Sequence, residues 1–210
     1  MLRARLARSM HDKEAPSGPT EQRGSLLSSG PDCRLNACVN YAFDDLYAYA
    51  EGYRRAGDIL AKELGADPRC GLDFLVYPLV FLYRHAIELQ LKGIMREGTR
   101  LLRQQPVPRK EREHHGLEAL WGLARQILEK VWPEGDPDLL SRIAKVIGEL
   151  SAADPDSQAF RYDRDKSGHR TKSMLTHVNI AQFHRLAEEA YRLLDGATTG
   201  LQALLDEQAG

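Results

Sequence analysis

A basic segment in the last third of the chain holds residue types that can act on a phosphate diester. Residues 160–172 read FRYDRDKSGHRTK, in which five basic and two acidic side chains give a net charge of +3. Such a segment attracts phosphate-bearing ligands. Arginine can hold a phosphate through two hydrogen bonds, and His169 can exchange a proton near neutral pH. RNA cleavage by attack of the neighbouring 2′-hydroxyl group requires both abilities.

The same segment is also compatible with a loop that has no catalytic or binding role. Its composition is equally that of a solvated, charged loop whose Phe160 and Tyr162 pack on the rest of the protein. If the segment binds RNA, the side chains expected to contact the phosphates are Arg161, Lys166, Arg170 and Lys172.

A second group of polar residues lies inside the most apolar part of the sequence, LYRHAIELQLK at 82–92. Arg84, Glu88 and Lys92 are four residues apart, so they share a helix face and can form ion pairs. His85 and Glu88 have the spacing of a metal site in a helical bundle, but no second Glu/His pair at a matching depth accompanies them. We expect Arg84, His85 and Glu88 to form a polar core network or the basic half of an anion site, without a metal or another cofactor.

The adjacent histidines His114 and His115 form a third candidate group. Adjacent histidines can bind a metal or cap a helix, but no cysteine or third ligand stands at a usable spacing. We expect one of them to pack near Trp121.

Helical periodicity dominates the chain, and no alternating strand pattern competes with it. The expected helices cover residues 39–64, 72–95, 117–131, 137–150 and 179–201. Pro78 is tolerated best in a first turn, so the regular part of the second helix should begin near it. Asp136 before Pro137, and Asn179, are expected N-caps. The pattern predicts an all-α bundle of about five helices, with the second helix in the centre.

The remaining segments define the expected domain organisation. Residues 1–35 are rich in Arg, Ser, Gly and Pro and are expected to be a disordered tail. Residues 36–206 would form a single bundle domain. A long polar loop, residues 151–175, precedes the last helix, and loops of that length in compact domains are usually functional or disordered.

The overall composition excludes several classes of protein. The chain has 210 residues, with 29 Lys and Arg against 30 Asp and Glu, so it is not a globally basic nucleic-acid-binding protein. No apolar run is long enough to span a membrane, and three cysteines without ligand spacing favour a reducing cytoplasm. Motifs of triphosphatases, serine hydrolases and zinc enzymes are missing from the sequence.

Three sequence segments together resemble the HEPN superfamily of prokaryotic helical domains. They are LYRHAIELQLK at 82–92, HGLEALW at 115–121 and DSQAFRY at 156–162, within a similarity that covers about residues 39–195. Many HEPN proteins are metal-independent RNA endonucleases that act as homodimers in toxin–antitoxin, abortive-infection and CRISPR systems. The family signature is an Arg, a polar residue, three variable residues and a His, which Arg164, Asp165 and His169 match. The resemblance implies that Arg164 holds the scissile phosphate and that His169 acts as acid or base.

The expected function is therefore cleavage of single-stranded RNA by a cytoplasmic HEPN-like homodimer in a toxin–antitoxin or anti-phage setting. The alternative is a non-catalytic HEPN-like module that binds a protein partner or a nucleotide and regulates a defence or signalling system. An antitoxin or a regulatory protein would be the protein partner. A third reading is that residues 96–112 and 161–172 bind RNA without hydrolysing it.

Overall fold

The computed structural model describes residues 26–39, 45–67, 69, 71–105, 107–108, 116–164, 167–171 and 175–210. The chain divides into two units, Met1–Tyr41 and Ala42–Gly210. The described part of the first unit contains one short 3-10 helix, η1 (Cys33–Leu35), which begins at a cap formed by Asp32.

The second unit is helical throughout its regular structure. Its helices are α1 (Asp45–Ala66), α2 (Leu72–Leu101), α4 (Leu117–Val131), α5 (Pro137–Ala153) and α6 (Ile180–Ala209). The described residues contain no strand, only an isolated antiparallel bridge between Arg164 and Arg170. These elements confirm the predicted all-α bundle. Within the described residues, none of the helices combines the length and apolar character of a membrane span.

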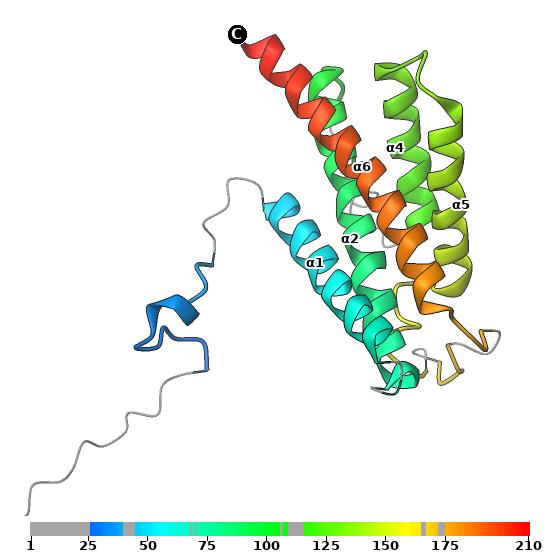
Figure 1. Cartoon of the computed structure of the whole chain (residues 1–210). Coiled ribbons are helices and arrows are strands. Elements are labelled where there is room, and N and C mark those ends of the chain that lie inside the picture. Colours follow the sequence, from blue (N-terminus) through cyan, green and yellow to red (C-terminus); the bar gives the residue numbers. More distant parts are fainter. Residues whose placement is uncertain are drawn as a thin grey trace, which may run out of the picture. The chain divides into compact units, whose positions relative to one another are not determined.

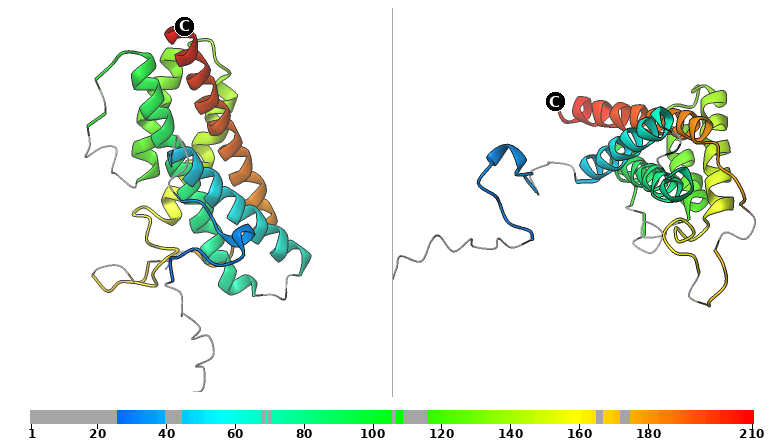
Figure 2. Two further views of the ribbon diagram at one scale, coloured as in Figure 1. Left: turned by 90° about the vertical axis from the view of Figure 1, so that its left-hand side faces the viewer. Right: turned by 60° about the horizontal axis from the view of Figure 1, so that its bottom comes forward.

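Helix α2 lies in the middle of the bundle (Figures 1 and 2). It packs against α1, α4 and α6, while α5 packs against α4 and α6. This position explains why α2 is apolar on nearly every face, since a helix surrounded by others has little solvated surface. The segment between α5 and α6 lies at the same end of the bundle as the turn between α1 and α2 (Figure 1).

The two N-caps that the sequence predicts are present at the starts of α5 and α6. The side chain of Asp136 accepts a hydrogen bond from the backbone N–H of Asp138, with Pro137 at the first helical position. The side chain of Asn179 accepts from the N–H of Gln182 at 2.9 Å. Both caps satisfy N–H groups that lack a partner in the first helical turn.

The predicted start of the second helix near Pro78 is wrong. Helix α2 begins at Leu72, so Pro78 lies inside it. Proline removes the N–H that would bond the carbonyl group of Phe74, four residues earlier. Phe74 and Pro78 are both exposed, so water can hydrate the carbonyl group and the helix continues.

Helices α1 and α2 approach each other closely at Gly57. A Cβ atom on Gly57 would lie 2.8 Å from Cε2 of Tyr83. We expect Gly57→Ala to lower the free energy of unfolding by about 1–3 kcal/mol because the added methyl group overpacks this contact. Gly52→Ala is the control on the same helix, because a Cβ there meets no atom within 4 Å. Alanine at 52 should stabilise α1 by up to about 1 kcal/mol. Equal stabilisation of both variants in urea unfolding would contradict the prediction.

Candidate functional site

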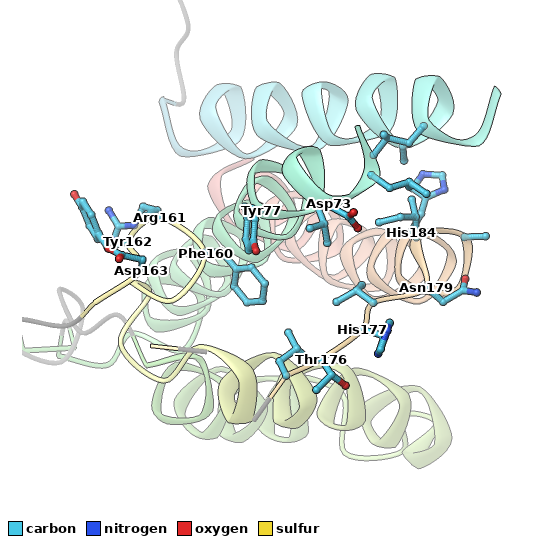
Figure 3. Close-up of a pocket in the computed structure, with 18 of the residues that line it drawn as sticks. Asp73, Tyr77, Phe160, Arg161, Tyr162, Asp163, Thr176, His177, Asn179 and His184 are labelled. Atoms are coloured by element: carbon cyan, nitrogen blue, oxygen red, sulfur yellow. The ribbon is translucent and has the colours of Figure 1, made fainter. Parts of the chain in front are cut away.

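A cavity of about 1370 Å³ lies where the segment between α5 and α6 meets the other helices. Its walls come from the end of α1, the first turns of α2, the connecting segment and the start of α6. The cavity is larger than most small-molecule sites, which measure about 300–1,000 Å³. Figure 3 shows Arg161, Tyr162 and Asp163 at one end of it and His177 and His184 at the other. The cavity can therefore accommodate an extended ligand.

The first end of the cavity is basic overall, although Asp163 also lies there and pairs with Arg164 at 3.8 Å. Arg161, Arg164 and Arg170 all line it, so three of the predicted phosphate contacts share one site. The backbone bridge between Arg164 and Arg170 closes a turn, and the N–H of Thr171 donates to the carbonyl of Asp163 at 3.1 Å. This turn brings together arginines that are up to nine positions apart in the sequence. The two predicted lysine contacts, Lys166 and Lys172, lie outside the described residues.

Arg161 is held by its own segment and by two aromatic rings. Its Nε atom donates to the carbonyl of Ser157 at 2.7 Å, and its Nη2 atom donates to the same carbonyl. The guanidinium carbon lies 5.4 Å from the ring centre of Phe81 and 5.6 Å from that of Tyr162. Both distances are within the range of a cation–π interaction.

Arg164 and His169 belong to the same exposed turn. The Arg164 Nη1 atom donates to the carbonyl of Gly168, directly before His169, at 2.8 Å. Gly168 has a φ of 83°, which glycine adopts without strain and which this turn requires. Arg164 lines the cavity, whereas His169 is absent from the described residues that line it. The structure thus brings the predicted pair into one turn but places only the arginine at the cavity wall.

The ion pairs expected from the spacing in α2 are present in the core. The Arg84 Nη1 atom donates to Glu88 at 3.1 Å, and the Lys92 Nζ atom donates to Glu88 at 2.7 Å. Arg84 also pairs with Asp154, with its Nε atom 3.2 Å from Oδ2 of that residue. Arg84, Glu88 and Asp154 are almost fully buried. Asp154 is a partner that the sequence analysis missed.

Asp154 also fixes the start of the segment that carries the arginines. Its Oδ1 atom accepts hydrogen bonds from the N–H groups of Gln158 at 2.6 Å and Ala159 at 2.8 Å. The next residue, Phe160, is buried in the core. Asp154 therefore attaches this segment to α2, directly before Arg161. Phe160 packs on the bundle as the alternative reading of the segment expects, but Tyr162 remains 56% exposed.

His85 packs between aromatic rings. Its ring lies edge-on to Tyr53 at 4.5 Å and stacks on Phe81 at 5.7 Å, centre to centre. The Nδ1 atom of His85 is 3.9 Å from an oxygen of Glu88. Within the described part of the chain, no group of three or more His, Cys, Asp or Glu residues is arranged to hold a metal ion. The geometry gives His85 a packing role beside the polar core network.

The other end of the cavity contains a histidine that the sequence analysis left without a role. The His184 Nε2 atom is 2.7 Å from Oδ1 of Asp58, which also accepts from the Tyr83 hydroxyl at 3.0 Å. Burial opposes ionisation of Asp58. The hydrogen bonds from His184 and Tyr83 and the charges of Lys62 and Arg54 outweigh this effect and hold the pKa of Asp58 below its usual value. The pKa of Tyr83 is raised, mainly by burial of its hydroxyl group and also by the nearby carboxylates.

This histidine belongs to a larger network that joins α1 to α6. Arg54 donates to both oxygens of Glu51, each at 2.8 Å, and to Glu188 at 3.1 Å. The hydrogen bond from Arg54 is the main reason that the pKa of Glu51 falls to about 2. Asp58 also contacts Arg54, so the contact between His184 and Asp58 belongs to this network. We therefore assign His184 a structural role, which is to hold α6 against α1.

The third group of candidate residues, His114 and His115, lies outside the described residues. Comparison with known proteins gives no match, neither to a family model, nor to a curated protein, nor to a solved structure. The assignment of a function therefore depends on the cavity and on the chemistry of its residues.

Proposed function

We propose that this protein is a metal-independent RNA endonuclease of the HEPN type, with its phosphate site at the basic end of the cavity. One observation carries the proposal: Arg161, Arg164 and Arg170 line a single cavity, next to the turn that holds His169. Guanidinium groups suit this role because they bind phosphate with paired, charge-assisted hydrogen bonds.

The proposed reaction is an internal transfer of the phosphodiester. The 2′-oxygen of a ribose attacks the adjacent phosphorus atom and loses its proton to His169, and the bond from phosphorus to the 5′-oxygen breaks. The 5′-oxygen takes a proton from water, and the hydroxide ion that remains takes the proton from His169. The products are a 2′,3′-cyclic phosphate and a 5′-hydroxyl group, with no net gain or loss of protons. The arginines neutralise the charge that grows on the phosphate oxygens. A bound metal is unnecessary for this step.

The histidines at the far end of the cavity are less suited to this step. Figure 3 places His177 and His184 at the end of the cavity away from Arg161. His184 is also engaged with Asp58. His169 is closer in sequence to these arginines. It directly follows Gly168, whose carbonyl group Arg164 contacts, and it directly precedes Arg170.

Cleavage of labelled single-stranded RNA in excess EDTA tests the proposal. We expect the parent protein to produce cyclic phosphate ends, and Arg164→Ala and His169→Ala each to reduce the rate by about 100-fold or more. Arg125→Ala is the matched control, because Arg125 is an exposed arginine on α4 that pairs with Glu129, four residues later in the same helix. Normal cleavage by both site variants, with their fold intact, would refute the site. Intact RNA after incubation with the parent protein would refute the activity.

A second function is favoured by the contacts of the arginines themselves. Arg161 and Arg164 both use side-chain donors on carbonyl groups of their own segment. A segment organised in this way also suits a non-catalytic module that binds a phosphate-bearing ligand or a regulatory protein. This alternative expects binding without turnover and full binding by His169→Ala.

The wider biological setting belongs to the same proposal. A HEPN-type enzyme would act as a homodimer in the cytoplasm, within a toxin–antitoxin or anti-phage system, and an antitoxin would be a partner. The molar mass in solution tests the dimer independently of the cleavage assay.

A further inference from the structure

We propose that Tyr162, supported by Arg161 and Phe81, is a stacking platform for an unpaired base of single-stranded RNA. This inference rests on the proposed RNA site, because the base would belong to the nucleotide whose phosphate the arginines hold. It adds a recognition element that phosphate contacts alone do not supply, since phosphate contacts carry no information about the bases.

The platform consists of an aromatic ring with a cation over one of its faces. The guanidinium carbon of Arg161 lies 5.6 Å from the ring centre of Tyr162 and 5.4 Å from that of Phe81. Phe81 is itself fixed, since it stacks on His85 at 5.7 Å and lies edge-on to Tyr53 at 6.3 Å. The chain of ring contacts connects Tyr162 to α2 and α1. Tyr162 thus shares its cation, Arg161, with a ring of the bundle core.

The exposure of Tyr162 is what points to a ligand. The neighbouring Phe160 is only 6% exposed, whereas Tyr162 is 56% exposed although it lines the cavity. A large aromatic ring at the surface, beside arginines, is the arrangement by which proteins bind single-stranded nucleic acid. A base stacks on the ring, and the backbone follows the basic groove.

Along the turn, the aromatic ring and the arginines are neighbours, as the base and the phosphate of one nucleotide are. Tyr162 is followed by Asp163 and then by Arg164, which is bridged to Arg170, and all four line the cavity. A base on Tyr162 would therefore have basic side chains beside it for its own phosphate. Paired bases in a duplex cannot stack on the ring, so the platform selects single strands.

Binding of a non-cleavable ligand tests this inference separately from catalysis. The probe is a 2′-O-methyl oligoadenylate, and inorganic polyphosphate is the probe that carries charge without bases. We expect Tyr162→Ala to weaken oligoadenylate binding by about 5- to 100-fold, the range for loss of one base–aromatic stack. We expect the affinity for polyphosphate to remain that of the parent. Tyr162→Phe should keep the affinity for oligoadenylate, because the ring is what stacks.

Tyr49→Ala is the matched control. Tyr49 is also 56% exposed, but it lies on α1 and does not line the cavity, so its removal should leave both affinities unchanged. An unchanged oligoadenylate affinity in Tyr162→Ala would overturn the platform. An equal loss for polyphosphate would also overturn it, because Tyr162 would then act only by ordering the arginines.

The two proposals fail in different ways. Binding that depends on Tyr162, without cleavage of ordinary RNA, supports the platform and refutes the nuclease. Cleavage by a Tyr162→Ala protein with parental affinity supports the nuclease and refutes the platform. A parent protein that binds no oligoadenylate refutes the platform, whereas only the cleavage assay refutes the nuclease.

Discussion

Replacing Asp154 with alanine is expected to lower the free energy of unfolding by about 3–5 kcal/mol, the usual effect of removing one partner of a buried ion pair. Arg84 is fully buried, and Asp154 contacts it through both the carboxylate and the backbone carbonyl. Alanine would leave a buried guanidinium with too little negative charge around it. It would also remove the acceptor for the N–H groups of Gln158 and Ala159. Urea unfolding followed by circular dichroism measures the loss.

Asp156→Ala is the matched control for this prediction. Asp156 is exposed and only two residues away, so its removal should change the free energy of unfolding by less than about 0.5 kcal/mol. Asp154→Asn should fall between the two, because the amide oxygen can still accept the hydrogen bonds from Gln158 and Ala159 while the charge is lost. A loss below about 1 kcal/mol in Asp154→Ala would show that the pair with Glu88 is sufficient for Arg84.

Asp154 also illustrates what the sequence can predict. The spacing of four residues between Arg84, Glu88 and Lys92 places them on one face of a helix, so their ion pairs follow from local geometry. The helix faces and the caps at Asp136 and Asn179 are predictable for the same reason, since each depends on residues a few positions apart. The all-α bundle follows from these local patterns.

Contacts between distant segments leave no such pattern. Arg84 and Asp154 are 70 residues apart, and Asp58 and His184 are 126 residues apart. Which polar residues meet across two helices depends on how the helices rotate and cross, and periodicity alone does not determine this. For the same reason the sequence predicts the basic segment but not the cavity that Arg161 and Arg164 line.

Replacing Arg161, Arg164 and Arg170 together with glutamine is expected to weaken binding of single-stranded RNA by about 100-fold or more at low salt, since each charge-assisted contact contributes about 1.5–3 kcal/mol. Each neutralised phosphate also releases counterions. The logarithm of the binding constant for a single strand therefore falls with the logarithm of salt concentration, with a slope of about 0.7 per phosphate. Three arginines on three phosphates contribute about 2 to that slope. Binding isotherms between low and moderate salt measure both quantities.

The control for this variant removes the same charge elsewhere. Arg55, Arg125 and Arg142 are exposed arginines that pair with carboxylates and do not line the cavity. Their triple glutamine variant loses an equal net charge, so any general attraction between protein and RNA falls equally in both proteins. A site-specific role predicts that only the cavity variant shows the decrease of about 2 in the slope. Equal losses in the two variants would mean that RNA responds to net charge alone, and the cavity would then have no special part in binding.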